Sequence, residues 1–509
     1  MSMGSWLNKK WIIFLAIVNV AIHLSVFNHL EYHRDELLYF SLCNHPAFGY
    51  ASVPPLTGWM AWIMKTLLGY HLFAVKLLPA LFSGVYVVLC SVLAESLGGK
   101  SYAQVLAAIG AIFTPFSLRV FHLYEPVFFD LFFWTLVYYV IILYMNTEKD
   151  KYLIRLGIVF GLAVLNKYLI MLLLPALFIP FLLTSWRKVF LNKALYIGMA
   201  LALLIVLPNI LWQMSHQFPV FRHMSELNSN QLVHVNSLDF FKDLLLMPFA
   251  VWILIFPGII LLIRDSRYRP IGISTVIVIV ALVLLRGKGY YALGVIPVWF
   301  AAGAVYWEGV LNKIWARIVL PVLIISLTIP IIPLGLPVFH QKRLIHYFDS
   351  LDKKYGLTLG RRFEDGTIHS LPQDYADQLG WEELTKITAE AYRQIPDKSK
   401  AMIYAENYGQ AGAISVIGKQ YGLPEPVSFS DSYRYWVPRH FDPDIEYFIY
   451  INDDLGEDVQ AAFSDIKIAG SISNKDAREY NTNVYLCTAP VRSFNLLWQD
   501  ALQRVKIDE

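Results

Sequence analysis

The chain has 509 residues, of which 56% are hydrophobic and 16% charged, and its mean hydropathy is +0.48. Soluble domains average about 25% charged residues, so this composition excludes a string of soluble domains of the same length. The 15% aromatic content and the absence of a short repeat exclude disorder, coiled coil and collagen. The class that remains is an integral membrane protein with many spans. Three scattered cysteines exclude a disulfide framework.

The charge divides the chain in two. Residues 1–339 contain 23 Lys+Arg and 13 Asp+Glu, a net charge of +10, whereas residues 340–509 contain 19 and 26, a net charge of −7. We therefore expect a multi-span membrane domain over residues 1–339 and a soluble domain over residues 340–509.

A transmembrane helix needs about 20 apolar residues. Residues 152–184 are either two spans, separated at Asn166 and Lys167, or one long broken helix, in which case the count falls by one and the downstream topology inverts. Counting two, the sequence predicts about eleven spans, near residues 11–28, 71–95, 102–118, 123–145, 152–167, 169–184, 194–213, 241–263, 271–286, 290–308 and 314–336.

The basic residues give an orientation. With a cytoplasmic N-terminus, 14 of the 23 basic residues of the membrane domain lie in cytoplasmic turns and helix ends, as the positive-inside rule requires. Eleven spans then place residues 340–509 on the outer side. No A-x-A-like cleavage site follows the first apolar run, so we expect that run to be retained as a span.

The first outer loop, at about residues 29–70, is longer than a simple connection. It contains the acidic pair Asp35 and Glu36, followed after Pro54-Pro55 by an apolar stretch over residues 56–68. That stretch is too short to span a bilayer, and its tryptophans predict a helix that lies in the membrane interface.

The C-terminal region has the pattern of a small α/β domain. Residues 381–393 have helical spacing, residues 401–405 are strand-like, and residues 410–421 predict a helix that ends at Gly422. Residues 446–451 and 483–487 predict two more strands.

Ionisable and tyrosine side chains gather at the outer ends of the predicted spans. Such residues are costly at membrane depth, and an anionic lipid headgroup would find both counter-charge and a general base there. The candidates are the acids Asp35 and Glu36, a group that could bind an anionic headgroup, made of Lys167, Arg286, Lys288, Tyr290 and Tyr291, and a second cluster of Arg119, His122, Glu125 and Asp130.

Simpler interpretations exist for several of these residues. Asp35 and Glu36 are equally well explained as a solvated pair, and a lysine at a helix end, such as Lys167, usually extends to the interface. Arg286 and Lys288 fit stop-transfer charges less well, because they lie on the outer side. The sequence lacks HExxH and CxxC motifs, so we expect no metal cage made of protein ligands alone.

Several short motifs follow one another along the membrane domain: HRDELLYF (33–40), VPPLTGWMAW (53–62), EPVFFD (125–130), LNKY (165–168) and GKGYYALGVIP (287–297). Their order resembles the family 39 glycosyltransferases, which include protein O-mannosyltransferases that use dolichyl-phosphate-mannose and the bacterial lipid A aminoarabinose transferase. The tail resembles soluble domains appended to bacterial members, at LPQDYADQLGW (371–381) and NYGQAGAISVIGKQYGLP (407–424).

The resemblance implies a GT-C fold, an active site at the outer face, and a sugar donor linked to polyprenyl phosphate. It also implies an inverting single displacement, in which an acid of the first outer loop is the base. That acid maps to the Asp35-Glu36 pair, with Asp35 preferred. Family members differ in metal use, so a requirement for a divalent metal does not follow.

These observations predict a polyprenyl-phosphate-dependent glycosyltransferase of a bacterial inner membrane. Its acceptor is a protein, a lipid A-like glycolipid or another envelope glycan, and no nucleic acid is expected. One rival is a transporter or flippase of lipid-linked sugars, which would favour charges at mid-membrane and an internal repeat. Another is a membrane-anchored assembly protein with an inactive transferase domain.

Overall fold

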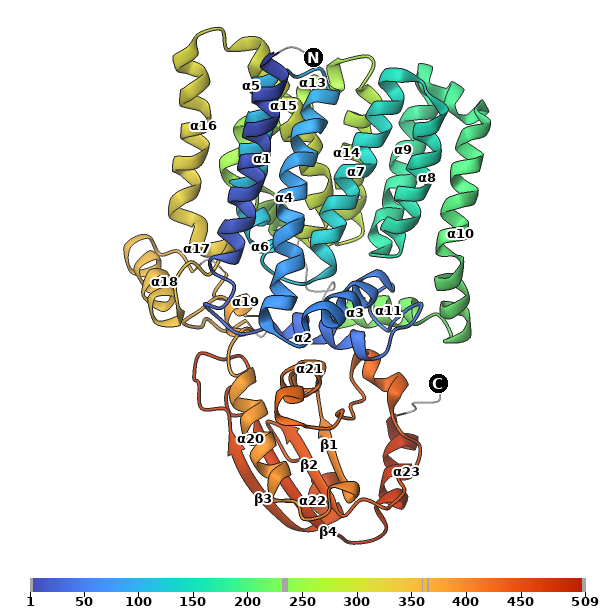
Figure 1. Cartoon of the computed structure of the whole chain (residues 1–509), viewed down its shortest axis with the longest axis vertical. Helices are drawn as coiled ribbons and strands as arrows, with labels where there is room; N and C mark the ends of the chain where they lie inside the picture. The colour runs from blue at the N-terminus through green and yellow to red at the C-terminus, as the bar shows by residue number, and fades with distance from the viewer. Residues whose placement is uncertain (1–2, 231–236, 359, 364–365, 506–509) are drawn as a thin grey trace. The chain divides into compact units, whose positions relative to one another are not determined.

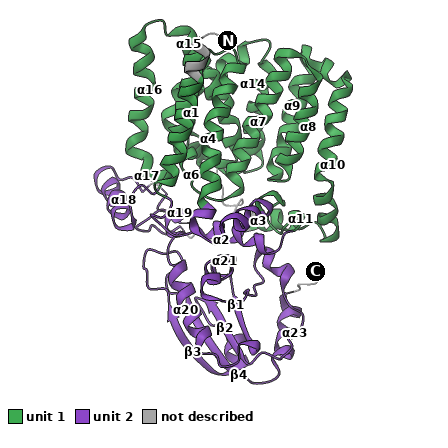
Figure 2. Ribbon diagram, viewed as in Figure 1, with its two compact units in different colours: residues 1–26, 47–57, 76–336 green, residues 27–46, 58–75, 337–509 purple. Residues whose placement is uncertain are grey.

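The computed structural model describes residues 3–230, 237–358, 360–363 and 366–505. The chain forms two compact units (Figure 2). Unit 1 comprises residues 1–26, 47–57 and 76–336, and unit 2 comprises residues 27–46, 58–75 and 337–509. Unit 2 therefore contains two segments of the predicted first outer loop in addition to the C-terminal region.

Unit 1 is built from helices (Figure 1). The α-helices, with α4 belonging to this unit from Lys76 onward, are α1 (Met3–Leu24), α4 (Leu72–Ser96), α5 (Ser101–Ile112), α6 (Pro115–Val120), α7 (Pro126–Thr147), α8 (Asp150–Val164), α9 (Leu173–Leu182), α10 (Lys193–Ser215), α11 (Pro219–Asn230), α12 (Ser237–Leu246), α13 (Trp252–Arg264), α14 (Arg269–Leu284), α15 (Ile296–Val310), α16 (Ile314–Thr328) and α17 (Ile332–Gly335). Short 3-10 segments include η2 (Tyr168–Leu172), η3 (Ser185–Leu191), η5 (Phe249–Val251) and η6 (Gly289–Val295).

Five stretches among the described residues are helical, long and apolar enough to cross a membrane, and two bent helix pairs raise the number to seven. The five are Leu72–Ser96, Pro126–Thr147, Lys193–Ser215, Gly289–Val310 and Ile314–Gly335. Shorter apolar helices, α5 and α14, accompany them. The count of about eleven spans stays a prediction.

Two predicted spans are interrupted. The segment over residues 102–118 is divided into α5 and α6, and Pro115 occupies the first turn of α6, where its missing N–H costs least. The segment over residues 241–263 is bent by 75° between α12 and α13, with Pro248 at the break. Residues 152–184 also do not form one continuous helix, because α8 ends at Val164 and the chain continues through η2 into α9.

Close helix pairs in unit 1 meet at glycine. A Cβ atom added at Gly157 of α8 would overlap the backbone of Gly198 in α10, and one added at Gly258 of α13 would overlap the backbone carbonyl of Trp299 in α15. Small residues let membrane helices pack through their backbones, where lipid provides little hydrophobic drive for association.

Unit 2 contains α2, the helix that carries Asp35 and Glu36, and a four-stranded sheet (Figure 1). The sheet order is β1-β2-β4-β3, with β1 parallel to β2 and the other pairs antiparallel. The α-helices and strands of unit 2 are α2 (Arg34–Ser41), α3 (Leu56–Leu68, which belongs to this unit from Gly58 onward), α18 (Gln341–Tyr355), α19 (Gln373–Ala376), α20 (Trp381–Gln394), β1 (Ala401–Ala405), α21 (Tyr408–Val416), β2 (Tyr447–Asn452), α22 (Glu457–Ala462), β3 (Phe463–Ser471), β4 (Asn483–Pro490) and α23 (Phe494–Val505).

Helices α23 and α20 pack against the sheet. Tyr404, Phe448 and Tyr450 belong to one apolar cluster with Phe494 and Trp498 of α23. Helix α20 packs against β2, β3 and β4. Successive strand residues point to opposite sides of a sheet, so the mostly buried strands β1, β2 and β4 supply side chains to both layers, whereas β3 is largely exposed.

The helix predicted over residues 381–393 and the three predicted strands are confirmed as α20, β1, β2 and β4, whereas the helix predicted over residues 410–421 is divided into α21 and the 3-10 turn η9 (Ile417–Tyr421). Helices α18, α19, α22 and α23 and strand β3 were not predicted. Strand β1 has its predicted bounds, as does α3 of the first outer loop, and Gly422 ends η9 with a φ of +70°. Glycine adopts this left-handed conformation without the steric cost that a side chain would add.

Candidate functional site

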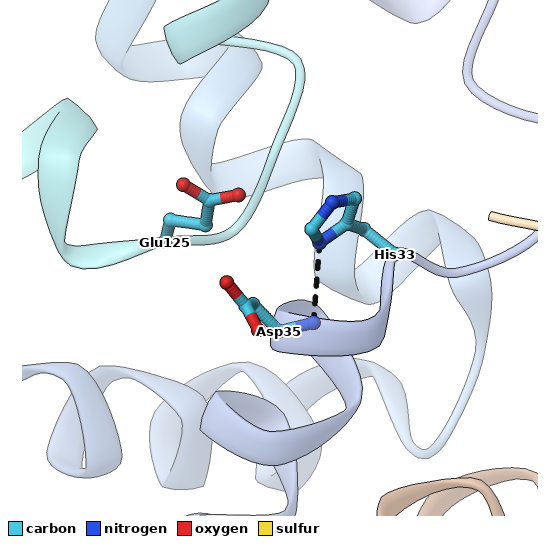
Figure 3. Close-up of side chains that lie close together, drawn as sticks. All are labelled: His33, Asp35 and Glu125. Carbon is cyan, nitrogen blue, oxygen red and sulfur yellow. Dashed lines mark hydrogen bonds between the residues drawn. The ribbon is translucent and has the colours of Figure 1, made fainter. Parts of the chain in front are cut away.

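The acidic pair of the first outer loop lies at the start of α2, where a capping box divides the roles of its residues. His33 is the N-cap residue, and its Nδ1 accepts a hydrogen bond from the Asp35 backbone N at 3.1 Å (Figure 3). In return, the His33 backbone N donates to Glu36 Oε2 at 2.8 Å. These bonds satisfy two of the backbone N–H groups that a helix start leaves unpaired.

Glu36 and Asp35 are therefore in different situations. Glu36 has 0% exposure, and its carboxylate accepts the His33 backbone N–H. Asp35 is half-buried, and its Oδ1 accepts a hydrogen bond from the Tyr408 hydroxyl at 2.9 Å. The Asp35 carboxylate thus accepts from a side-chain donor, whereas the Glu36 carboxylate accepts from the start of its own helix.

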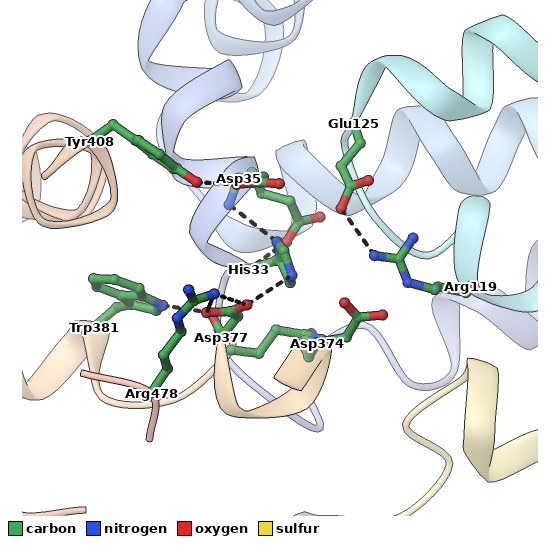
Figure 4. A network of polar contacts seen from close by, with 11 residues as sticks. His33, Asp35, Arg119, Glu125, Asp374, Asp377, Trp381, Tyr408 and Arg478 are labelled. Carbon is green, nitrogen blue, oxygen red and sulfur yellow. Dashed lines mark hydrogen bonds and ion pairs between the residues drawn. The ribbon is translucent and has the colours of Figure 1, made fainter. Parts of the chain in front are cut away.

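A buried network joins the start of α2 to the C-terminal region within unit 2 (Figure 4). The Asp377 carboxylate lies 3.2 Å from Arg478 Nη1 and 3.9 Å from His33 Nε2. Its backbone carbonyl accepts hydrogen bonds from the Arg34 N at 3.0 Å and from the indole N–H of Trp381 at 2.8 Å. Burial raises the pKa of Asp377, and the charges of His33 and Arg478 act in the opposite direction.

In unit 1, Lys167 is the centre of a group of side chains from three elements. Its Nζ lies 3.9 Å from Asp130 Oδ2 of α7, and it lies over the rings of Tyr290 and Tyr291 at 5.3 and 5.1 Å from their centroids. The indole N–H of Trp134 donates to the other Asp130 oxygen at 3.1 Å. A lysine that only extended to the interface would lack these partners.

The second predicted cluster is partly assembled. Arg119 and Glu125 lie 3.8 Å apart at their charged atoms (Figure 4), and Glu125 is the N-cap residue of α7. His122, which lies between these two residues in the sequence, is buried. Asp130, in contrast, belongs to the Lys167 group.

The two remaining cations differ in exposure. Lys288 is half-buried and is the N-cap residue of η6, which carries Tyr290 and Tyr291. Arg286 is exposed and has a φ of +53°. Among the described residues, no side-chain hydrogen bond or ion pair joins Arg286 to the Lys167 group.

A protein metal site usually needs three or more ligands. His33 and Asp35 in unit 2 and Glu125 in unit 1 are residues of ligating type. Over the described ranges, neither unit by itself brings three such side chains together.

Sequence reasoning did not find Tyr408, Asp377, Arg478 or Trp134. Tyr408 and Asp377 lie in the two tail motifs, NYGQAG and LPQDYADQLGW, so the signal was present. The motifs did not show which residues these side chains contact, because Tyr408 and Asp35 are 373 residues apart in the chain.

Comparisons with known proteins agree with this architecture. Residues 52–212 match the profile of a family described as dolichyl-phosphate-mannose-protein mannosyltransferase. A search of curated protein sequences finds no match.

Solved structures match over nearly the whole chain. ArnT from Cupriavidus metallidurans has a TM-score of 0.62 bound to undecaprenyl phosphate and 0.61 in the apo state, at 13% and 14% identity, covering 94% of this chain and 98% of ArnT in both cases. The oligosaccharyltransferase AglB from Archaeoglobus fulgidus, in complex with an inhibitory peptide and a dolichol-phosphate, has a TM-score of 0.51 at 12% identity, covering 88% of this chain and 70% of AglB.

These likenesses confirm the predicted fold class and the predicted resemblance. The chain has the GT-C fold, with apolar membrane helices and a small C-terminal sheet domain, and it is similar to ArnT.

The capping role of Glu36 predicts a difference between two variants. Glu36→Ala removes the acceptor of the His33 N–H and should lower the free energy of unfolding by about 1 kcal/mol, the usual cost of a lost cap. Glu36→Gln keeps an acceptor oxygen at the same position and should stay close to wild type. The thermal midpoint of the purified protein in detergent measures both. Equal midpoints for the two variants would contradict this role.

Proposed function

We propose that this protein is an inverting glycosyltransferase of a bacterial inner membrane, which moves a sugar from a polyprenyl-phosphate donor to an envelope acceptor at the outer face. The observation that carries the proposal is the different bonding of the two acids at α2: the Glu36 carboxylate takes part in the helix cap, whereas the Asp35 carboxylate accepts a hydrogen bond from Tyr408. The family profile and the likeness to a protein that was crystallised with undecaprenyl phosphate support the donor class.

In the proposed reaction, Asp35 is the general base. The acceptor hydroxyl attacks the anomeric carbon of the donor sugar and loses its proton to the Asp35 carboxylate, while the bond from that carbon to the phosphate oxygen breaks. A carboxylate within hydrogen-bond distance of the hydroxyl is sufficient for this transfer. A single displacement inverts the configuration at the anomeric carbon.

The leaving group is a lipid phosphate, and its growing negative charge needs cations. We propose that Lys167 and Lys288 bind this phosphate, with Tyr290 and Tyr291 beside it. The rings of both tyrosines already lie against Lys167, and Lys288 begins the segment that carries them. A cation that is in place before the reaction stabilises the charge without reorganisation.

Arg286 is less well placed for this role, because it is exposed and, among the described residues, forms no hydrogen bond or ion pair with this group. Arg119, His122 and Glu125 form a second polar cluster, and the proposed reaction gives them no role in proton transfer or phosphate binding. The acceptor class is a protein, a glycolipid or a glycan, and the C-terminal region is proposed to lie on the periplasmic side.

The first prediction from this mechanism concerns Asp35. Asp35→Asn keeps the shape of the side chain and removes the base, so the rate of sugar transfer should fall by about 10²- to 10⁴-fold. Donor binding should survive, because other residues hold the phosphate. The assay uses the purified protein in liposomes with a panel of undecaprenyl-phosphate sugars and a bacterial envelope extract as acceptor. Release of undecaprenyl phosphate is followed by mass spectrometry.

Two matched variants discriminate between the candidate bases in the same assay. Glu36→Gln and Asp130→Asn each replace an acid by its amide, and both should transfer sugar faster than the Asp35→Asn protein. Near wild-type transfer by the Asp35→Asn protein would remove Asp35 as the base. If all three variants are fully active, the proposed mechanism is wrong.

The second prediction concerns the donor phosphate. Lys288→Ala and Lys167→Met should each lower transfer efficiency by about 10- to 150-fold, because a hydrogen bond to a charged group contributes about 1.5–3 kcal/mol. Lys188→Ala, which removes an exposed lysine from η3, is the control and should leave efficiency unchanged. If a variant of Lys288 or Lys167 keeps the wild-type transfer efficiency, the lysine that it lacks does not bind the phosphate.

A further inference from the structure

Tyr408 is the first residue of α21, and its hydroxyl donates a hydrogen bond to Asp35 Oδ1 at 2.9 Å (Figure 4). The Arg34 guanidinium lies over its ring, 4.6 Å from the centroid. Both contacts lie within unit 2, and they join the C-terminal region to the proposed base.

The start of α21 is itself firmly held, so the position of Tyr408 is well defined. Asn407 caps the helix by accepting hydrogen bonds from the backbone N of Gly409 and Gln410 at 2.9 and 3.1 Å. The Gln410 side chain completes a capping box at this end. Glu479 then accepts hydrogen bonds from the side-chain amides of both Asn407 and Gln410.

Two glycines allow α21 to approach α2 closely. A Cβ atom added at Gly409 would lie 2.7 Å from Arg34 Cγ, and one added at Gly412 would lie 2.7 Å from the backbone C of Leu37. Real Cβ atoms do not approach other atoms this closely. The glycines of the NYGQAG motif therefore set the distance between the two helices, and backbone packing holds α2 in place without the phenol group of Tyr408.

The phenol is suited to donate a hydrogen bond and not to accept a proton. Burial and the neighbouring Asp35 charge raise the pKa of Tyr408, so its hydroxyl stays protonated near neutral pH. A carboxylate has two oxygens with about four lone-pair positions. A bond to Oδ1 fixes the rotation of the group and still leaves Oδ2 with the capacity to accept the proton of an acceptor hydroxyl.

We propose that Tyr408 is a positioning residue for catalysis: its hydroxyl orients the Asp35 carboxylate for proton abstraction, so that the C-terminal region completes the base. This inference rests on the proposed function. Orientation matters because a reacting group displaced by about 1 Å loses on the order of 10²-fold in rate.

The test compares two variants that each remove one phenol hydroxyl from the same region. Tyr408→Phe keeps the ring against Arg34 and loses only the bond to Asp35. Tyr450→Phe loses a bond of similar kind, from the Tyr450 hydroxyl to Glu406 Oε2 at 3.0 Å, at a carboxylate outside the start of α2. Release of undecaprenyl phosphate is measured over a range of concentrations of the undecaprenyl-phosphate sugar that wild type uses.

For Tyr408→Phe we expect kcat to fall by about 10- to 100-fold while the KM for the donor stays within about twofold of wild type. Tyr450→Phe should match wild type in both constants. In an Asp35→Asn background, adding Tyr408→Phe should change the residual rate by less than about twofold, because the hydroxyl acts through a base that is already absent. The thermal midpoint of each protein shows whether it is folded.

The outcomes separate the two levels of the proposal. An active wild type with an unchanged kcat in the Tyr408→Phe protein overturns the role of Tyr408 and leaves the transferase intact. Independent, multiplicative effects of Asp35→Asn and Tyr408→Phe also overturn it. A wild-type protein that releases no undecaprenyl phosphate from any donor overturns the proposed function, and the role of Tyr408 with it.

Discussion

The hydrogen bond from the His33 backbone to Glu36 is the interaction on which the proposed chemistry of unit 2 depends. Two adjacent carboxylates at a helix start would both be attracted to its unpaired N–H groups. Here the Glu36 side chain accepts the N–H of the N-cap residue and is fully buried, whereas Asp35 is half-buried and its carboxylate accepts a hydrogen bond from Tyr408. A general base must be within reach of the acceptor hydroxyl, and the half-buried Asp35 meets this requirement better than the fully buried Glu36.

The same helix start is hydrogen-bonded to the C-terminal region. The backbone of Arg34 donates to the carbonyl of Asp377, and the backbone of Glu31 donates to the carbonyl of Gln378. The two tail motifs thus contact the loop at two places, through Asp377 on one side and Tyr408 on the other. A network of this kind is costly if half satisfied, which makes its members sensitive positions for substitution.

Much of the fold follows from local sequence patterns. The helix over residues 56–68, the strand over residues 401–405 and the glycine at 422 were predicted at the positions where they occur, since each depends on neighbouring residues alone. The breaks at Pro115 and Pro248 were missed because apolar content outweighed proline in the prediction. The GT-C fold itself came from the order of motifs and is confirmed by the solved structures.

The candidate site was predictable as a set of residues and not as a set of contacts. Lys167, Asp130, Tyr290 and Tyr291 were all named from the sequence, but their assembly around one ammonium group depends on helix packing. The capping box was missed because its N-cap residue is His33, whereas the usual signature begins with serine or threonine. Tyr408 was missed because no local pattern links residues from opposite ends of a chain.

Native mass spectrometry of the purified protein, loaded with an undecaprenyl-phosphate sugar and then mixed with a bacterial envelope extract, tests the transferase directly. The proposed reaction predicts that the mass of the bound lipid falls by one sugar residue, which leaves undecaprenyl phosphate on the protein. A donor that binds and stays unchanged would contradict sugar transfer and favour a transporter of lipid-linked sugars.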